Sequence, residues 1–237
     1  MPTAAIITIG NELLSGDVAD TNAQWLAKRL ERLGIQVRLV ATLPDDRGQI
    51  GRFVREQAAE AAVVVVTGGL GGTPDDVTRE AIADGFGVAQ AEVPEIACPL
   101  RARFAHDPEY AAKWANLPVG SRPLENPLGG APGFAFGNVY VLPGLPAEMR
   151  AMFATIEDGL RCERPIGSWR RRYRTTESRI VGVLEAMGTR HPTVRVGSYP
   201  SFDEGRSEVE VVVKSSDPAA LEAAATWLEQ ALEDATR

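Results

Sequence analysis

The fold of this chain is decided by residues 63–78, which read Val63-Val64-Val65-Val66-Thr67-Gly68-Gly69-Leu70-Gly71-Gly72-Thr73-Pro74-Asp75-Asp76-Val77-Thr78. Four consecutive valines predict a strand that is buried on both faces, as in a parallel sheet. The glycine-rich turn leaves backbone N–H groups uncovered, and the helix that follows adds partial positive charge at its N-terminus. This combination favours a phosphate ligand. The spacing is neither that of a Walker A loop nor that of the Gly-x-Gly-x-x-Gly dinucleotide fingerprint.

Polar side chains end this stretch. Asp75 and Asp76 could hold a divalent cation beside the phosphate, because carboxylate oxygens are preferred ligands of hard cations. Alternatively, one of these aspartates only caps the helix. Thr78 has the same two interpretations, as a metal ligand or as part of the helix cap. The sequence leaves both interpretations open.

The residues before this stretch predict a doubly wound sheet. Strands are expected at 4–9, 35–43 and 62–67, a loop at 11–16, and helices at 21–33 and 50–61. This β-α-β-α-β order predicts a mostly parallel sheet between two layers of helices, an α/β fold. Ligands of such folds bind outside the carboxyl ends of the strands. Glu12, Asp45, Asp46, Asp75 and Asp76 all fall at those ends, so we expect these carboxylates near one ligand.

Two more loops are rich in glycine and proline. Residues 126–133 and 143–146 flank an expected strand at 139–142, after a helical excursion at 95–115 and before a helix at 146–160. Because glycine permits close approach of the backbone, both loops could contact the ligand, although either could be only a tight turn. The candidate contacts in these loops are Asn126, Gly130, Pro143 and Gly144.

The last part of the chain has a different pattern. An arginine-rich segment at 161–172 is expected to be a linker, and the domains are placed at 1–165 and 166–237. The pattern after the linker predicts a small α+β domain with an antiparallel element. Its expected elements are a strand at 171–175, a helix at 177–187, strands at 193–199 and 207–214, and a helix at 218–233.

Composition limits the class of protein. The chain has 237 residues, 44% hydrophobic residues and a net charge of −7, which argues against a general nucleic-acid binder. No apolar run approaches the roughly 20 residues that cross a bilayer, and the N-terminus has no charged region of a signal peptide. We therefore expect a cytoplasmic protein without a membrane partner.

Several separated motifs together resemble one known family. They are Gly10-Asn11-Glu12-Leu13-Leu14-Ser15-Gly16, Asp20-Thr21-Asn22, Gly68-Gly69-Leu70-Gly71, Asp75-Asp76-Val77-Thr78, Asn126-Pro127, Ala131-Pro132-Gly133 and Leu142-Pro143-Gly144-Leu145-Pro146-Ala147-Glu148-Met149. About the first 160 residues resemble the molybdenum-cofactor-biosynthesis (molybdopterin-binding) domain, in the branch of competence/damage-inducible protein A. The tail, with Gly197-Ser198-Tyr199-Pro200, is similar to the KH-like domain of that branch. The chain departs from the family pattern at Gly72 and Gly130, where the family usually has proline and threonine.

The resemblance implies a nucleotide- or pterin-type ligand and cleavage of a pyrophosphate bond, as in ADP-ribose or FAD, with a divalent metal. It also implies a homo-oligomer, a dimer or trimer. Asp76 matches the metal-linked aspartate, and Asp45 a second important aspartate. With the residues chosen above, the expected site has Asp76 and Asp45 as catalytic groups and Asp76, Asp45 and Glu12 as metal ligands. The expected ligand-binding residues are Gly68, Gly69, Gly71, Gly72, Thr73, Thr78, Asn126, Gly130, Pro143 and Gly144.

Three functions remain in competition, and the sequence leaves open whether the protein is an enzyme. The first is a metal-assisted pyrophosphohydrolase; the motifs contain no histidine, which favours Mg2+, with Co2+ or Ni2+ as alternatives. The second is a molybdopterin- or nucleotide-binding protein without turnover. The third, nucleic-acid binding through the arginines at 161–179, is disfavoured, because the turn at 188–191 lacks the second glycine of a Gly-x-x-Gly loop.

Overall fold

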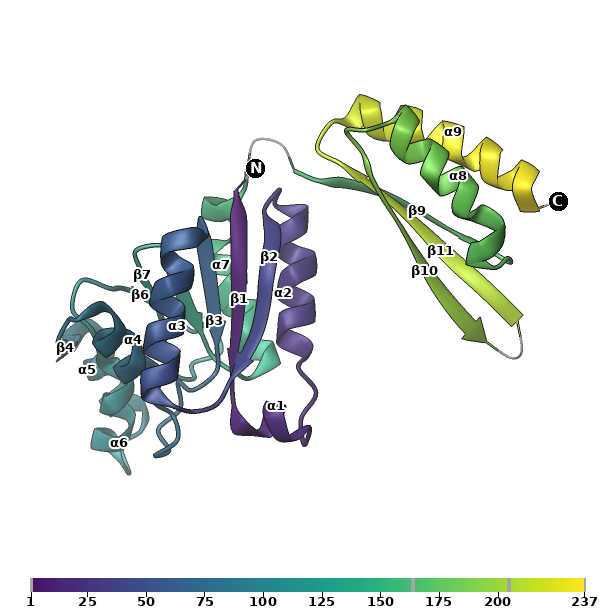
Figure 1. Cartoon of the computed structure of the whole chain (residues 1–237). Coiled ribbons are helices and arrows are strands. Elements are labelled where there is room, and N and C mark those ends of the chain that lie inside the picture. Colours follow the sequence, from purple (N-terminus) through teal and green to yellow (C-terminus); the bar gives the residue numbers. More distant parts are fainter. Residues whose placement is uncertain (1, 163–164, 204–205, 237) are drawn as a thin grey trace. The chain divides into compact units, whose positions relative to one another are not determined.

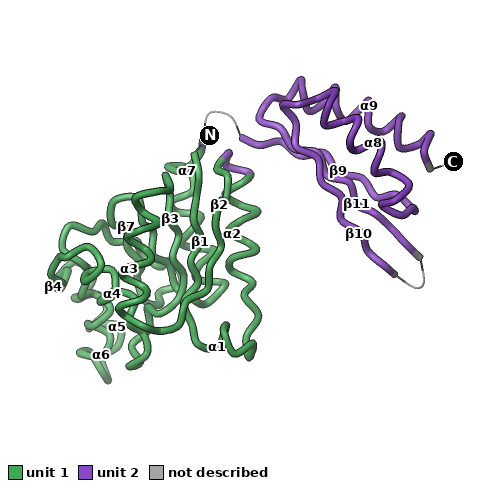
Figure 2. The backbone as a smooth tube through the Cα atoms, in the orientation of Figure 1, with its two compact units in different colours: residues 1–31, 35–161 green, residues 32–34, 162–237 purple. Residues whose placement is uncertain are grey.

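The structure is a computed structural model that describes residues 2–162, 165–203 and 206–236. The chain forms two compact units (Figure 2). The first contains residues 1–31 and 35–161, and the second contains residues 32–34 and 162–237. The boundary expected after residue 165 stays a prediction.

The first unit contains a six-stranded sheet with the strand order β2-β1-β3-β8-β7-β6. Strands β2, β1, β3 and β8 are parallel, whereas β7 and β6 are added in antiparallel pairs. The elements are β1 Thr3–Ile9, α1 Asn11–Ser15, α2 Thr21–Arg32, β2 Gln36–Leu43, α3 Arg47–Glu60, β3 Val63–Thr67, α4 Thr78–Phe86, β4 Gln90–Glu92, α5 Pro94–Arg103, α6 Pro108–Ala112, the 3-10 helix η1 Lys113–Ala115, β5 Asn116–Pro118, β6 Arg122–Leu124, β7 Gly133–Phe136, β8 Val139–Leu142 and α7 Pro146–Leu160. The expected mostly parallel α/β sheet is confirmed.

Helices cover both faces of this sheet (Figure 1). Ile7 and Val66 point toward α3 and α4, where they join the buried core that contains Ile82. On the other face lie α2 and α7, whose Trp25 and Phe153 rings meet edge to face at 5.5 Å. All five residues of β3 are buried, as the valine run predicted. Burial on both faces explains why the strand is continuously apolar.

Two local expectations in this unit were wrong. The expected loop at 11–16 is the short helix α1, which ends at Gly16 in the left-handed conformation with φ of +82°. Strand β7 begins inside the glycine-proline cluster and pairs with β8 through Phe134 and Val141. The sequence did not predict β7, because the glycines and prolines before it indicate a turn.

The second unit is a three-stranded antiparallel sheet with two helices. Its elements are β9 Gly167–Tyr173, α8 Glu177–Arg190, β10 Arg195–Asp203, β11 Arg206–Ser215 and α9 Pro218–Thr236, and the strand order is β10-β11-β9. Both helices lie on one face of this sheet (Figure 1), where Ile180, Val211 and Leu228 form a separate core. The expected α+β tail is confirmed, but the arginine-rich segment is not wholly a linker, because β9 begins at Gly167. No helix in the described part of the chain is both long and apolar enough to span a bilayer.

Candidate functional site

A cleft of about 630 Å³ opens at the carboxyl ends of the parallel strands. Its wall combines acidic side chains, glycine backbone and apolar side chains. The residues that line it are Thr8, Ile9, Gly10, Glu12, Leu13, Val18, Ala19, Asp20, Thr21, Asn22, Asp45, Thr67, Gly68, Gly69, Leu70, Gly71, Asp75, Asp76, Trp114, Gly130, Ala131, Pro143, Gly144, Leu145, Pro146 and Glu148. The cleft therefore lies where a doubly wound sheet places its ligand.

The structure brings the predicted carboxylates of Glu12, Asp45 and Asp76 to this one cleft. Asp45 follows β2, and its Oδ2 accepts a hydrogen bond from the Asn11 N–H at 2.8 Å. Partial burial is the main cause that raises the pKa of Asp45, and repulsion by Glu12, Asp75 and Asp76 adds to it, against the lowering effect of the Asn11 hydrogen bond. These carboxylates are thus close enough to influence one another's charge.

Asp76 bonds to its own loop in this structure, and the catalytic and metal-binding roles expected of it stay predictions. Its Oδ1 accepts the Gly71 N–H at 2.8 Å, and its Oδ2 accepts the Thr73 N–H at 2.9 Å and the Thr73 hydroxyl at 2.5 Å. Both carboxylate oxygens of Asp76 therefore accept hydrogen bonds from within loop 71–76 and stabilise its conformation. The Gly71 N–H is used in this bond, whereas Gly71 itself lines the cleft, and its expected contact with the ligand stays a prediction.

Thr78 and Thr73 do not line the cleft. Thr78 is fully buried, and its hydroxyl donates to the Gly68 carbonyl at 2.9 Å. The side chain thereby fixes the base of the glycine turn, where Gly69 has φ of +65° and a Cβ would lie 2.2 Å from the Thr78 hydroxyl. Thr78 is therefore a structural residue, and the expected ligand contact was wrong because its hydroxyl faces the backbone. Val77, not Thr78, is the N-cap of α4.

Arg79 is a residue of this loop that the sequence reasoning missed. It is 3% exposed, and its guanidinium donates to the carbonyls of Leu70 at 2.7 Å and Gly71 at 2.6 Å. Burial lowers the pKa of Arg79, with Glu80 and Asp76 acting in the opposite direction. Arg79 thus supports the glycine turn from behind. In the sequence, the signal for Arg79 was its position directly after the motif Asp75-Asp76-Val77-Thr78.

The two loops rich in glycine and proline, 126–133 and 143–146, contribute some of their residues to the cleft. Gly130, Pro143 and Gly144 line it, whereas Asn126 is buried outside it. The Asn126 amide donates to Glu148 Oε2 at 2.9 Å and to the Ala131 carbonyl at 3.1 Å, so this residue positions a cleft carboxylate rather than the ligand. The expected direct contact of Asn126 was therefore wrong.

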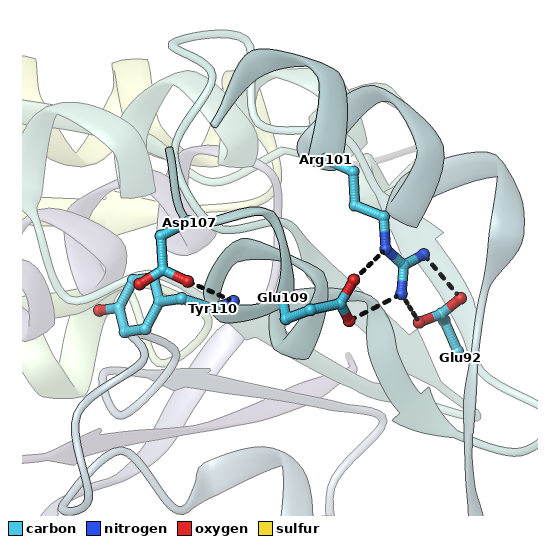
Figure 3. Close-up of polar contacts among 5 residues, drawn as sticks. All are labelled: Glu92, Arg101, Asp107, Glu109 and Tyr110. Atoms are coloured by element: carbon cyan, nitrogen blue, oxygen red, sulfur yellow. Dashed lines mark hydrogen bonds and ion pairs between the residues drawn. The ribbon is translucent and has the colours of Figure 1, made fainter. Parts of the chain in front are cut away.

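The excursion between α4 and β6 contributes Trp114 to the lining of the cleft. Arg101 lies between Glu92 and Glu109, and Asp107 caps the turn that carries Tyr110 (Figure 3). A Cβ on Gly72 would lie 2.5 Å from the Tyr110 ring. Gly72 and Thr73 line a second hollow of about 550 Å³ rather than the cleft, and the ligand contacts expected from them stay predictions.

A metal site is not preformed by protein side chains alone. In residues 2–162, 165–203 and 206–236, no three histidine, cysteine or acidic side chains are grouped so that they could hold a metal ion. The expected triad of Glu12, Asp45 and Asp76 is therefore not assembled, since Asp76 is directed into its own loop. The acidic wall nevertheless fits the way in which Mg2+ is usually held, by one or two carboxylates together with phosphate oxygens of the substrate.

Comparison with known proteins identifies the first unit. The family model described as a probable molybdopterin binding domain matches residues 5–161. The chain belongs to the molybdopterin-binding domain family. A model described as the middle domain of FAD synthase matches residues 172–236, which covers the KH-like tail.

Relatives assign this molybdopterin-binding domain to the CinA branch. A CinA-like protein of Thermosynechococcus vestitus is 34% identical over 92% of this chain, which spans 55% of the length of that relative. A protein of Archaeoglobus fulgidus is 40% identical over 82% of this chain and 84% of its own length. The crystal structure of the protein CinA with unknown function from Thermoplasma acidophilum has a TM-score of 0.63 and 35% identity, and covers 68% of this chain and 99% of its own.

Proposed function

We propose that the cleft binds a nucleotide- or pterin-type phosphorylated ligand and hydrolyses its pyrophosphate bond with the help of a divalent metal. The observation that carries the proposal is the group of carboxylates that lines one cleft, Glu12, Asp45, Asp75 and Asp76. Partial burial first, and then repulsion by the other three carboxylates, raises the pKa of Asp45 there. Adjacent like charges at one ligand site are unfavourable unless a cation joins them. An anionic ligand without a cation would make this repulsion worse.

The two kinds of cleft wall suit the two ends of such a ligand. Leu13, Val18, Trp114 and Leu145 supply apolar surface for a planar ring system. The acidic side chains follow the carboxyl ends of the strands, where the diphosphate end of the ligand would lie. Glu12 approaches the backbone closely, since a Cβ on Gly10 would lie 2.4 Å from its carboxylate. Glycine at position 10 is therefore required for this placement of Glu12.

The roles of the residues follow from this geometry. Asp45 and Glu12 would hold the cation, which supplies charge neutralisation and activation of water when bound. Asp76 and Arg79 keep the glycine turn in shape through loop 71–76 and the Leu70 and Gly71 carbonyls. We also propose the expected homo-oligomer, a dimer or trimer, which light scattering would measure.

A turnover assay tests the proposal. Purified protein is incubated with ADP-ribose or FAD and Mg2+, Co2+ or Ni2+, and release of AMP is followed with and without EDTA. We expect AMP only when a divalent ion is present. Asp45→Asn keeps an acceptor oxygen for the Asn11 N–H but removes the charge, so it should lower turnover by about 100-fold or more.

Asp46→Asn is the matched control. Asp46 is the neighbouring aspartate, caps α3 by accepting the Gln49 N–H at 2.8 Å, and does not line the cleft. Because asparagine caps helices as well as aspartate, this variant should keep full activity. Equal activity of both variants would contradict the role of Asp45.

The alternative is a binding protein without turnover, because the same turn and apolar wall would serve it. A thermal-shift screen separates the two functions. A ligand at 100 times its Kd adds about 2.7 kcal/mol of stability. Stabilisation by a pterin or nucleotide without AMP release under any metal condition would favour the binding protein.

A further inference from the structure

The sheet of the second unit carries arginine side chains on both of its faces. On β9, the Arg171 guanidinium forms ion pairs with Glu229 at 2.6 Å and Glu233 at 3.6 Å, both on α9, so Arg171 points to the helix-covered face. Successive side chains of a strand point to opposite faces. Arg170 and Arg172 therefore point to the face that α8 and α9 do not cover.

Strand register extends this basic face across the sheet. Arg170 pairs with Val212, and Arg172 pairs with Glu210. Two residues after Val212 on β11, and so on the same face, Lys214 lies opposite Arg195 of β10. Arg174 belongs to the same face, because it approaches Glu208 at 3.8 Å. Among the side chains that the structure describes on the uncovered sheet face, the acidic ones are Glu208 and Glu210 and the basic ones are Arg170, Arg172, Arg174, Arg195 and Lys214.

The arginines of this face keep much of their hydrogen-bonding capacity. Arg172 and Arg174 contact Glu210 and Glu208 at 3.6 and 3.8 Å, longer than a hydrogen bond, and their side chains are 72% and 77% exposed. Arg195 lies directly opposite Lys214 on this face, and the basic side chains outnumber the acidic Glu208 and Glu210 among the side chains described there. Charge complementarity therefore favours a polyanionic occupant.

An aromatic ring lies on the same face. Tyr199 is opposite Glu210, in the same row of the sheet as Arg172, and is 55% exposed. The ring leans along the strand over Gly197, since a Cβ there would be 3.3–3.6 Å from the outer atoms of the Tyr199 ring. Val212, the cross-strand partner of Gly197, is only 4% exposed. Tyr199 is therefore an exposed platform for stacking, with Glu210 directly opposite it and Arg172 beyond Glu210 in the same row.

We propose that this uncovered sheet face binds single-stranded nucleic acid. A strand whose bases stack on Tyr199 would place its phosphates along the arginines, the combination by which proteins hold single strands without reading their sequence. A base-paired duplex would offer phosphates but no free base to the ring. The proposal differs from the sequence-based judgement for two reasons. The net charge of −7 describes the whole chain and does not reveal a local basic face. Residues 188–190 belong to helix α8 rather than to the turn that the sequence indicated.

Fluorescence anisotropy of the full chain with a labelled oligothymidylate of about 12 nucleotides tests the proposal; such a length is within the range of single-strand sites. If five phosphates are neutralised, the logarithm of the affinity should fall with a slope of about −3.5 against the logarithm of the salt concentration. Affinity should then drop by about 100-fold between 50 and 200 mM salt. A matching blunt duplex should bind more weakly.

Two sets of variants assign the surface. The double variant Arg170→Ala/Arg172→Ala should weaken binding at least tenfold and reduce the salt slope by about 1.4. Its control, Arg179→Ala/Arg190→Ala, removes the same charge from α8 and should bind as the unchanged chain does. Tyr199→Ala should lose about fivefold or more, and Tyr199→Phe should retain binding, because only the ring is needed.

Three results would overturn the proposal. The first is the absence of salt-sensitive binding at 50 mM salt. The second is an equal loss of binding in the two double variants. The third is unchanged binding by Tyr199→Ala together with equally tight binding of heparin, which would show a site for any polyanion rather than for a nucleic acid.

Discussion

Replacement of Asp76 by alanine should open loop 71–76 before it affects any chemistry. The variant loses three hydrogen bonds to a carboxylate, from the N–H groups of Gly71 and Thr73 and from the Thr73 hydroxyl. A hydrogen bond to a charged group contributes about 1.5–3 kcal/mol net, and less where solvent reaches it. Taking the three together as at least about 2 kcal/mol, we expect Tm to fall by about 4–8 °C for a unit of this size.

The assay combines thermal unfolding with amide hydrogen exchange, both without ligand or metal. Exchange at Gly71 and Thr73 should accelerate by about 30-fold or more, which corresponds to about 2 kcal/mol of local stability. Gly71→Ala should have a similar effect, because its Cβ would lie 2.3 Å from Asp76 Oδ2. If Asp76→Ala abolished turnover while Tm and exchange stayed unchanged, Asp76 would be a metal ligand and the loop-closing role would be refuted.

Three further perturbations test the site. Burial and neighbouring carboxylates raise the pKa of Asp45, so its ionised form destabilises the folded state above that pKa. Asp45→Asn should therefore raise Tm at pH 7. This gain should disappear as the pH falls toward about 4, the ordinary pKa of an aspartate. Gly69→Ala should lower the free energy of unfolding in urea by about 2–3 kcal/mol, because position 69 has a positive φ and a Cβ there would displace Thr78. The control Gly159→Ala lies in open space on α7 and should be neutral or stabilising. In Arg79→Lys, the ammonium cannot reproduce the two guanidinium hydrogen bonds to the Leu70 and Gly71 carbonyls, so the free energy of unfolding should fall by about 1.5–3 kcal/mol. The loss should appear as a lower urea midpoint at an unchanged m-value. An unchanged midpoint would contradict the supporting role of Arg79.

Most of the fold could be predicted from local patterns. The valine run at 63–66 fixed a buried strand, and alternation with amphipathic segments fixed the parallel order of β1, β2 and β3. Helix α7 begins at Pro146 and ends at Leu160, as its capping pattern and periodicity predicted. The short strands β6 and β7 were missed, because four or fewer residues next to glycines and prolines have no periodicity to detect.

The site was predicted less completely. Motif order indicated the correct strand ends, and Glu12, Asp45 and Asp76 do line one cleft. The sequence could not show in which direction a side chain points. Thr78 turns inward to the Gly68 carbonyl, and Asp76 bonds to its own loop, although both are polar residues next to a glycine turn.

The sequence by itself determined which residues form strands and helices and which polar groups follow the parallel strands, because these properties depend on neighbours in the chain. Only the tertiary structure decided which of those polar groups face the cleft and which satisfy buried backbone. It also decided that Arg170 and Arg172 share a sheet face with Tyr199, whereas Arg171 pairs with α9. Such assignments depend on register and packing between segments far apart in the chain, which no local pattern records.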